Sequence, residues 1–370
     1  MRLVDDFTTE GIKYAGSKQK LIPQILSLVR ETKSKVVLDG FSGTTRVSQA
    51  LARNGYSVIS NDAAIWSEIF ANCYLINKKS ASYYQPMIDH LNALKPRDGW
   101  FSENYGGVAD EGKIVSISED GLKKSWQLHN TRKLDSIREE IDKMKLPFVE
   151  KSVLLTSLIR ALDEVDNTLG HFSSYLHHWS RRSYKDMKLK VPTLIKNKGL
   201  NQVFRSDIFD LLPKVEVDLA YFDPPYGSNN EKMPPSRIRY SAYYHIWKSV
   251  CLNDKPQTFG KAKRRSDSSD SLSSSMFEEF RKNEEGNFVA VEAIKKITKE
   301  VRAKYVLLSY SSGGRATSEQ LQEAMLDNGK LMKTIKIDHK KNVMANMRWT
   351  DEWIKESDHP HQEFLFLMKK

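Results

Sequence analysis

The apolar positions at the start of the chain switch between a helical and a strand-like spacing. Residues 20–30 carry a single apolar stripe, which predicts an amphipathic helix. The members of this stripe are Leu21, Ile22, Ile25, Leu26 and Val29. Apolar runs of strand length follow at residues 35–39 and 56–62, and a turn rich in small residues leads into a helix between them. This order of strand, turn, helix and strand predicts the first half of a nucleotide-binding α/β sheet.

The spacing changes in the middle of the chain. Residues 79–199 show no alternation of strand and helix, and the patterns at 130–145 and 154–162 are helical. We therefore predict a mainly helical subdomain that is inserted between residues 1–78 and 200–370. Strand-like apolar runs return after it, at residues 215–222, 305–310, 332–337 and 364–368. These runs predict the second half of the sheet.

Residues 229–290 have a third kind of composition. The segment 266–275 is mostly serine and directly follows a basic cluster at 261–265. Such a segment buries little apolar surface, so we predict a mobile loop over about 229–290.

The overall composition sets limits on the class of protein. Hydrophobic residues make up 39% of the 370 residues and charged residues 28%, which predicts a packed core rather than disorder. The apolar stretches near the two ends are too short to span a bilayer, and the first ten residues lack the apolar core of a signal peptide. Cys73 and Cys251 form no CxxC pair, which argues against a disulfide framework or a structural zinc site. We expect a cytoplasmic protein.

The charge balance indicates a polyanionic partner. Lys and Arg number 58 against 47 Asp and Glu, a formal net charge of +11. The excess is clustered near residues 181–190, 261–265 and 333–348, with Tyr, His and Trp interleaved. This pattern predicts a nucleic-acid interface, although a basic solubilising surface and a solvated loop tip remain alternatives. The candidate DNA-binding residues are Arg181, Arg182, Lys185, Lys261, Lys263, Arg264 and Arg265.

The tetrad Asp223-Pro224-Pro225-Tyr226 directly follows a predicted strand, where an α/β sheet places its ligands. The two prolines lack an N–H, so this turn presents carbonyl and carboxylate acceptors next to an aromatic ring. Acceptors beside a stacking surface suit a planar substrate that carries an amino group, such as adenine or cytosine. An ordinary strand-ending turn is the alternative.

A second turn and a second acid also follow predicted strands. The turn Asp39-Gly40-Phe41-Ser42-Gly43-Thr44-Thr45 lacks a third glycine, and it is either a tight connection or a ligand loop. Asp62 lies 19 residues after Gly43 and ends the next strand, where an acid holds a ribose diol or caps a helix.

These segments together resemble the ordered motifs of D12-class (Dam-like) DNA adenine-N6 methyltransferases. The matching segments are Lys13-Tyr14-Ala15-Gly16-Ser17-Lys18, Phe41-Ser42-Gly43-Thr44, Asp62, Asp223-Pro224-Pro225-Tyr226 and Leu308-Ser309-Tyr310-Ser311. Their order is similar to the α arrangement, with the cofactor motif first and the catalytic tetrad last. The resemblance implies a Rossmann-like α/β fold with a mixed seven-stranded sheet and helices on both faces. It also implies a DNA-modifying protein of the bacterial nucleoid and a restriction-modification system with a separate endonuclease.

The resemblance implies S-adenosylmethionine as the cofactor and assigns residues to it. Tyr14, Ala15 and Lys18 would border its methionine part, and the turn from Asp39 through Phe41, Ser42, Gly43 and Thr44 would pass beneath it, as small residues allow. Asp62 would bind the ribose, Asp223 would close the site, and Asp207 would lie near the adenine unless it only caps a helix. The departure at Thr45 makes a nicotinamide dinucleotide a poorer fit.

The electronics of the substrate predict the mechanism. The amino nitrogen of adenine is a weak nucleophile because its lone pair is delocalised into the ring. If Asp223 and the Pro224 carbonyl each accept one N–H, the lone pair is localised and attacks the methyl group without a strong base. The base must leave the helix, with Tyr226 as its stacking surface. Cytosine N4, an RNA substrate and a catalytically silent DNA-binding module remain alternatives.

The predicted insertion carries the candidate target-reading residues, within 167–190. This segment includes His171, Tyr175, His177 and His178. The histidines have no further ligand at a metal-binding spacing, so no metal is predicted.

Overall fold

The computed structural model describes residues 6–108, 124–173, 176, 178–196, 199–227, 239–269, 275–279, 281–338 and 362–370. Tyr175 and His177, half of the serine stretch at 266–275, and the end of the third basic cluster lie outside these residues.

A seven-stranded sheet forms the base of the molecule, in the order β10-β11-β9-β6-β1-β2-β5. The strands are β1 (Val36–Asp39), β2 (Ser57–Asn61), β5 (Gln202–Phe204), β6 (Val217–Phe222), β9 (Ala303–Ser311), β10 (Lys330–Asp338) and β11 (Gln362–Lys369). Strands β5, β2, β1, β6 and β9 are parallel neighbours, and β11 lies antiparallel between β9 and β10. The predicted mixed seven-stranded α/β sheet is therefore confirmed.

Helices cover both faces of this sheet because successive strand residues point in opposite directions. Val37 of β1 packs in one apolar cluster with α1 (Ile22–Glu31) and α2 (Arg46–Arg53). Leu38, the next residue, packs in a second cluster with α8 (Ile208–Leu211), α11 (Val289–Glu300) and α12 (Ser318–Leu326). Short 3-10 turns at η1 (Lys18–Leu21) and η4 (Leu212–Lys214) border these helices.

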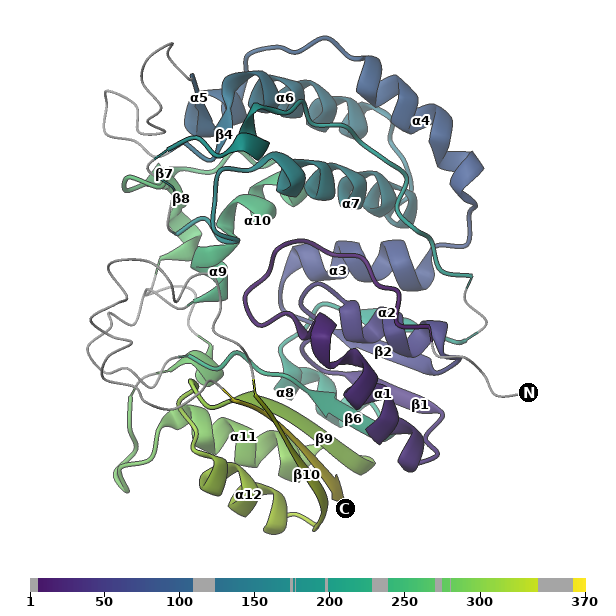
Figure 1. Ribbon diagram of the computed structural model, residues 1–370, viewed down its shortest axis with the longest axis vertical. Helices are drawn as coiled ribbons and strands as arrows, with labels where there is room; N and C mark the ends of the chain where they lie inside the picture. The colour runs from purple at the N-terminus through teal and green to yellow at the C-terminus, as the bar shows by residue number, and fades with distance from the viewer. Residues whose placement is uncertain are drawn as a thin grey trace.

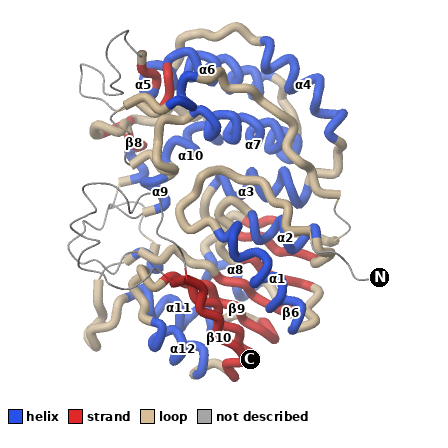
Figure 2. The backbone as a smooth tube through the Cα atoms, in the orientation of Figure 1, coloured by secondary structure: helices blue, strands red, loops and turns tan. Residues whose placement is uncertain are grey.

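A helical region lies beside the sheet, at the top of Figures 1 and 2. Its elements are α3 (Ile65–Ala71), the π-helix η2 (Asn72–Ile76), α4 (Ala81–Ala93), α5 (Trp100–Tyr105), β3 (Gly106–Gly107), β4 (Trp126–Gln127), α6 (Leu128–Lys143), α7 (Phe148–Val165) and η3 (Arg181–Tyr184). Its core includes Trp126 and Leu158, and it extends to Phe70 of α3 and Trp247, which lie outside residues 79–199. The division at those bounds stays a prediction.

The predicted loop at 229–290 is partly wrong, because ordered elements form within it. These are α9 (Tyr240–Tyr243), α10 (His245–Leu252), the hairpin β7 (Thr258–Phe259) and β8 (Arg264–Arg265), η6 (Ser266–Ser268) and η7 (Met276–Glu278). The apolar side chains of Ile246, Trp247, Val250 and Cys251 are buried in the core of the helical region. Their helical spacing was hidden by the polar composition on either side. Within the described residues, no helix is long and apolar enough to cross a membrane.

Candidate active site

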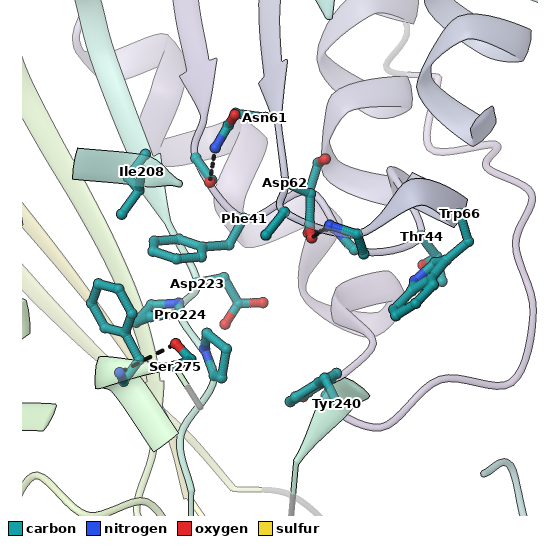
Figure 3. Close-up of a pocket in the computed structure, with 18 of the residues that line it drawn as sticks. Phe41, Thr44, Asn61, Asp62, Trp66, Ile208, Asp223, Pro224, Tyr240 and Ser275 are labelled. Atoms are coloured by element: carbon teal, nitrogen blue, oxygen red, sulfur yellow. Dashed lines mark hydrogen bonds between the residues drawn. The ribbon is translucent and has the colours of Figure 1, made fainter. Parts of the chain in front are cut away.

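A cavity of about 670 Å³ opens at the carboxyl ends of β1, β2 and β6. Figure 3 shows side chains from these strand ends directed toward one another around it. All the residues predicted for catalysis and for cofactor binding line this one cavity. They are Tyr14, Ala15, Lys18, Asp39, Phe41, Ser42, Gly43, Thr44, Asp62, Asp207, Asp223, Pro224, Pro225 and Tyr226. Residues that are far apart in sequence therefore meet at the edge where an open α/β sheet binds ligands.

The turn after β1 depends on its glycines. A Cβ on Gly40 would come within 2.7 Å of the Phe222 ring, so no larger residue fits without displacing that side chain. Gly43 has a positive φ of 52°, and a Cβ there would approach the Tyr14 ring at 3.2 Å. The backbone between them can therefore lie close to a ligand.

Asp62 fastens this turn to the end of β2. Its Oδ2 accepts the Gly43 N–H at 2.8 Å and its Oδ1 accepts the Ala64 N–H at 2.9 Å. Burial raises the pKa of Asp62, and the backbone hydrogen bonds oppose that rise. A carboxylate has about four acceptor positions, so these two contacts leave capacity for further hydroxyl donors.

Asp39 presents an unsatisfied acceptor at the cavity wall. The side chain is 1% exposed, and its Oδ2 accepts the Ser48 hydroxyl at 2.6 Å. Its Oδ1 is buried and has no hydrogen-bond partner among the described residues. Burial, partly opposed by the Ser48 contact, raises the pKa of Asp39 to about 7. A buried acceptor without a partner is costly, and a ligand that carries an N–H donor would satisfy it.

The tetrad forms an ionic cluster with the N-terminal loop. Lys18 Nζ lies 3.1 Å from Asp223 Oδ1 and 4.8 Å from the centre of the Tyr226 ring. The Tyr226 hydroxyl donates to the same Asp223 oxygen, and its ring lies 4.5 Å from that of Tyr310. Burial raises the pKa of Asp223 to about 6, and the neighbouring Lys18 ammonium limits the rise. Figure 3 shows the Asp223 carboxylate pointing into the cavity.

Several residues that sequence patterns missed complete the site. Tyr244 stacks on Tyr14 at 4.3 Å, and its hydroxyl accepts the Ala15 N–H at 2.7 Å. The Tyr240 hydroxyl donates to the Ala15 carbonyl at 3.0 Å. Phe277, just after the serine stretch, lies 4.9 Å from the Phe41 ring. These aromatics follow no motif, and their sequence neighbourhood suggested a loop.

Asp207 has the geometry of a helix cap, because its Oδ1 accepts the Phe209 N–H at 2.8 Å at the start of α8. It also lines the cavity, beside Ile208 and Phe277. Its role toward an adenine ring stays a prediction.

Two of the predicted DNA-binding residues form ion pairs within the protein, and one of them is buried. Arg265 is 2% exposed, and its guanidinium donates to Asp254 at 2.6 and 2.7 Å and to Asp267 at 2.9 and 3.1 Å. Arg182 pairs with Asp166 at 2.7 Å and also donates to its carbonyl. The burial of Arg265 argues against its predicted contact with DNA, whereas the Arg182 side chain is 34% exposed and its contact with DNA stays a prediction.

None of the other predicted DNA-binding residues lines the cavity. Arg181, Lys185 and Lys261 are exposed, Lys263 is half-buried, and Arg264 packs over the Phe259 ring at 5.1 Å. Their contact with DNA stays a prediction.

The described histidines gather no metal ligands. His171 stacks on Tyr243 at 4.2 Å, and burial lowers its pKa to about 4. No group of three potential metal ligands occurs in the part of the chain that the structure describes.

Comparison with known proteins extends these findings. Residues 14–306 match the family described as D12 class N6 adenine-specific DNA methyltransferase. The chain is 29% identical over 329 residues to modification methylase StsI of Streptococcus sanguinis, which covers 84% of the chain and 45% of that protein. It is 24% identical over 370 residues to the type II methyltransferase M.FokI of Planomicrobium okeanokoites, covering 97% of the chain and 53% of that protein. It is 24% identical over 328 residues to the type II methyltransferase M.NlaIII of Neisseria lactamica, covering 86% of the chain and 89% of that protein. The chain thus spans about half the length of the first two relatives.

Proposed function

The chain belongs to the D12 class of N6 adenine-specific DNA methyltransferases, and on this premise we propose that it methylates N6 of an adenine flipped out of duplex DNA. One observation carries the proposal. The acceptor turn at Asp223 and Pro224 opens into the same cavity as the residues expected to hold the methyl donor. Donor and acceptor sites that share one cavity can bring the two reacting groups together.

The residues around the cavity fit S-adenosylmethionine. The unpartnered buried oxygen of Asp39 suits the ammonium group of an amino acid, and Asp62 suits a ribose diol. The apolar side chains of Ile208, Phe41 and Phe277 suit a purine ring. When bound, this cofactor supplies an electrophilic methyl group on a positively charged sulfur, which a cavity with several carboxylates favours.

Asp223 and Pro224 prepare the nucleophile. The carboxylate and the carbonyl each accept one N–H of the adenine amino group, which localises the lone pair on the nitrogen. Asp223 must be ionised for this role, and its pKa of about 6 leaves it ionised at neutral pH. The proton lost from the nitrogen leaves through Asp223 or solvent. Positioning and charge supply most of the rate, as expected where no strong base is needed.

The DNA-binding part of the proposal rests on charge and exposure. Arg181 and Lys185 are exposed on the helical region, and Lys261 is exposed at the β7–β8 hairpin. Cations on two separate segments suit contacts to DNA phosphates at two places. We assign sequence reading to the helical region around residues 79–199.

A restriction-modification role follows from the relatives' names. StsI is named a modification methylase, and M.FokI and M.NlaIII are named type II methyltransferases. We propose that this chain similarly protects specific DNA sites against a separately acting endonuclease.

The test is transfer of labelled methyl groups to unmethylated genomic DNA, followed by digestion to nucleosides. We expect label in N6-methyldeoxyadenosine with the wild type and none with Asp223→Ala, whose cofactor affinity stays close to normal. Label at cytosine N4 would correct the base. Label on total RNA offered in a parallel reaction, with none on DNA, would correct the polymer. A protein that binds DNA but neither binds nor uses the cofactor would be a silent DNA-binding module, which refutes the proposal.

A further inference from the structure

Glu363 reaches the active site from the last strand of the sheet. β9 runs parallel to β6, whereas β11 runs antiparallel to β9 with Glu363 opposite Ser311, the last residue of β9. The beginning of β11 therefore lies at the edge where β6 ends and Asp223 follows. Glu363 is 8% exposed, so its carboxyl group is held inside the protein.

Two donors connect Glu363 to Asp223. Lys18 Nζ lies 3.6 Å from Glu363 Oε1 and 3.1 Å from Asp223 Oδ1. The Tyr226 hydroxyl lies 3.5 Å from Glu363 Oε2 and also donates to Asp223 Oδ1. Lys18 is fixed further by the Gly16 carbonyl, which accepts from Nζ at 3.0 Å. The two carboxylates thus share the Lys18 ammonium, and the Tyr226 hydroxyl, which donates its one hydrogen to Asp223, lies within reach of Glu363.

This arrangement makes the two oxygens of Asp223 unequal. Lys18 and Tyr226 both contact Oδ1, and none of the described residues makes a polar contact to Oδ2. A carboxylate held by one oxygen keeps the acceptor capacity of the other. An adenine amino group needs one such open acceptor.

We infer that Glu363 is a positioning residue, which holds Lys18 and Tyr226 against one oxygen of Asp223 so that the other oxygen receives the amino group of the substrate. The inference rests on the proposed methyl transfer. Glu363 itself touches neither the substrate nor the cofactor, and it acts through Lys18 and Tyr226.

The negative charge of Glu363 opposes ionisation of Asp223. A positioning role of Glu363 can therefore be distinguished from an electrostatic role. Burial raises the pKa of Asp223, Lys18 lowers it, and Glu363 raises it again. The charged and titratable groups around Asp223 are Lys18, Glu363, Tyr226, Asp39, Tyr221 and Tyr240. Removing the Glu363 charge alone should therefore favour the ionised form of Asp223, which its role requires. A loss of activity on its removal must come from geometry.

The test compares Glu363→Gln with Glu300→Gln, an exposed glutamate on α11 that serves as the control. We expect Glu363→Gln to lower kcat about 10- to 100-fold, the effect of misplacing a reacting group by about 1 Å. Cofactor affinity measured by calorimetry should change less than about threefold, because none of the described contacts of Glu363 involves Asp39 or Asp62, the polar residues proposed to hold the cofactor. The acidic limb of the kcat profile should move to lower pH, because a like charge has been removed. The control should match the wild type in all three measurements.

An unchanged or increased kcat in Glu363→Gln would overturn the inference. So would an equal loss of kcat and cofactor affinity, which indicates general disruption of the site. A second measurement does not depend on activity: the urea midpoints of Glu363→Gln, Lys18→Met and the double variant. We expect the double variant to lose less than the sum of the single losses, whereas additive losses would show that Glu363 does not hold Lys18. If wild-type protein transfers no methyl group, the proposed function fails, and this cycle still decides whether the contact exists.

Discussion

Replacing Lys18 with methionine tests how Asp223 stays ionised in a buried site. Lys18 is 5% exposed, and its ammonium lies 3.1 Å from Asp223 Oδ1 and 3.6 Å from Glu363 Oε1. Methionine has a similar length and no charge. The change removes the cation that stabilises the charge of Asp223. It also leaves Asp223 beside the like charge of Glu363 with no cation between them, and both effects favour the protonated form of Asp223.

The distance sets the size of the effect. At an effective dielectric constant of about 20, unit charges 3.1 Å apart attract by about 5 kcal/mol, which is an upper limit because the carboxylate can relax. A close opposite charge typically lowers an aspartate pKa by about 1 to 3 units. Its loss should raise the Asp223 pKa from about 6 to between about 7 and 9. The ionised fraction at pH 7 then falls about 2- to 90-fold.

The assay is the pH dependence of kcat/KM for methyl transfer, between pH 5.5 and 9.5. We expect the acidic limb of Lys18→Met to move upward by about 1 to 3 pH units, with part of the lost activity recovered at the alkaline end. Lys20→Met, an exposed lysine on the same 3-10 turn, is the matched control and should leave the limb in place. A loss of activity that is equal at all pH values would refute the electrostatic role given to Lys18.

Three further changes test other parts of the site. Asp39→Asn should raise the melting temperature at pH 8 but not at pH 4. The reason is that burial penalises only the ionised form of Asp39, whose pKa in the folded state, about 7, exceeds the usual aspartate value. Calorimetry should also show weaker cofactor binding by this variant. Gly40→Ala should lower stability by about 1–3 kcal/mol in urea unfolding, because the added Cβ would lie 2.7 Å from Phe222, and unchanged stability would contradict the close packing. Arg265→Met should lower stability with little direct effect on DNA phosphates, whereas Lys261→Ala should keep stability and reduce the salt dependence of DNA binding by about one phosphate contact.

The sheet could be predicted because its central strands are buried on both faces. β6 has a near-continuous apolar run and ends directly before Asp223, so both the strand and the site residue after it can be recognised in the sequence. β5 was missed because this short edge strand has exposed and half-buried side chains and carries no periodic signal. The helix α10 was missed for a different reason, since polar neighbours masked its apolar stripe.

The predicted site residues that follow strands meet in one cavity, whereas the cavity-lining aromatic residues of other segments were not predicted. Asp39, Asp62 and Asp223 each follow or end a strand, and topology brings such positions together. Arg265 illustrates the opposite case. Its charge is visible in the sequence, but its burial and its ion pairs with Asp254 and the nearby Asp267 are revealed only by the fold. A count of cations therefore overestimates the surface available to DNA.

The helical region also holds the N-terminal loop that lines the cavity, which no sequence boundary suggested. Lys13, at the start of the loop that carries Tyr14 and Lys18, binds the buried Asp166 of the helical region at 2.6 Å. Arg182 contacts the same carboxylate at 2.7 Å. Asp166 thus joins the loop that carries Tyr14 and Lys18 to the segment beside the exposed basic residues. Separating the buried Asp166 carboxylate from either cation is costly, so the loop and this segment keep a fixed position relative to each other. The helical region is therefore part of the structure that forms the active site and cannot be regarded only as an attachment that reads DNA.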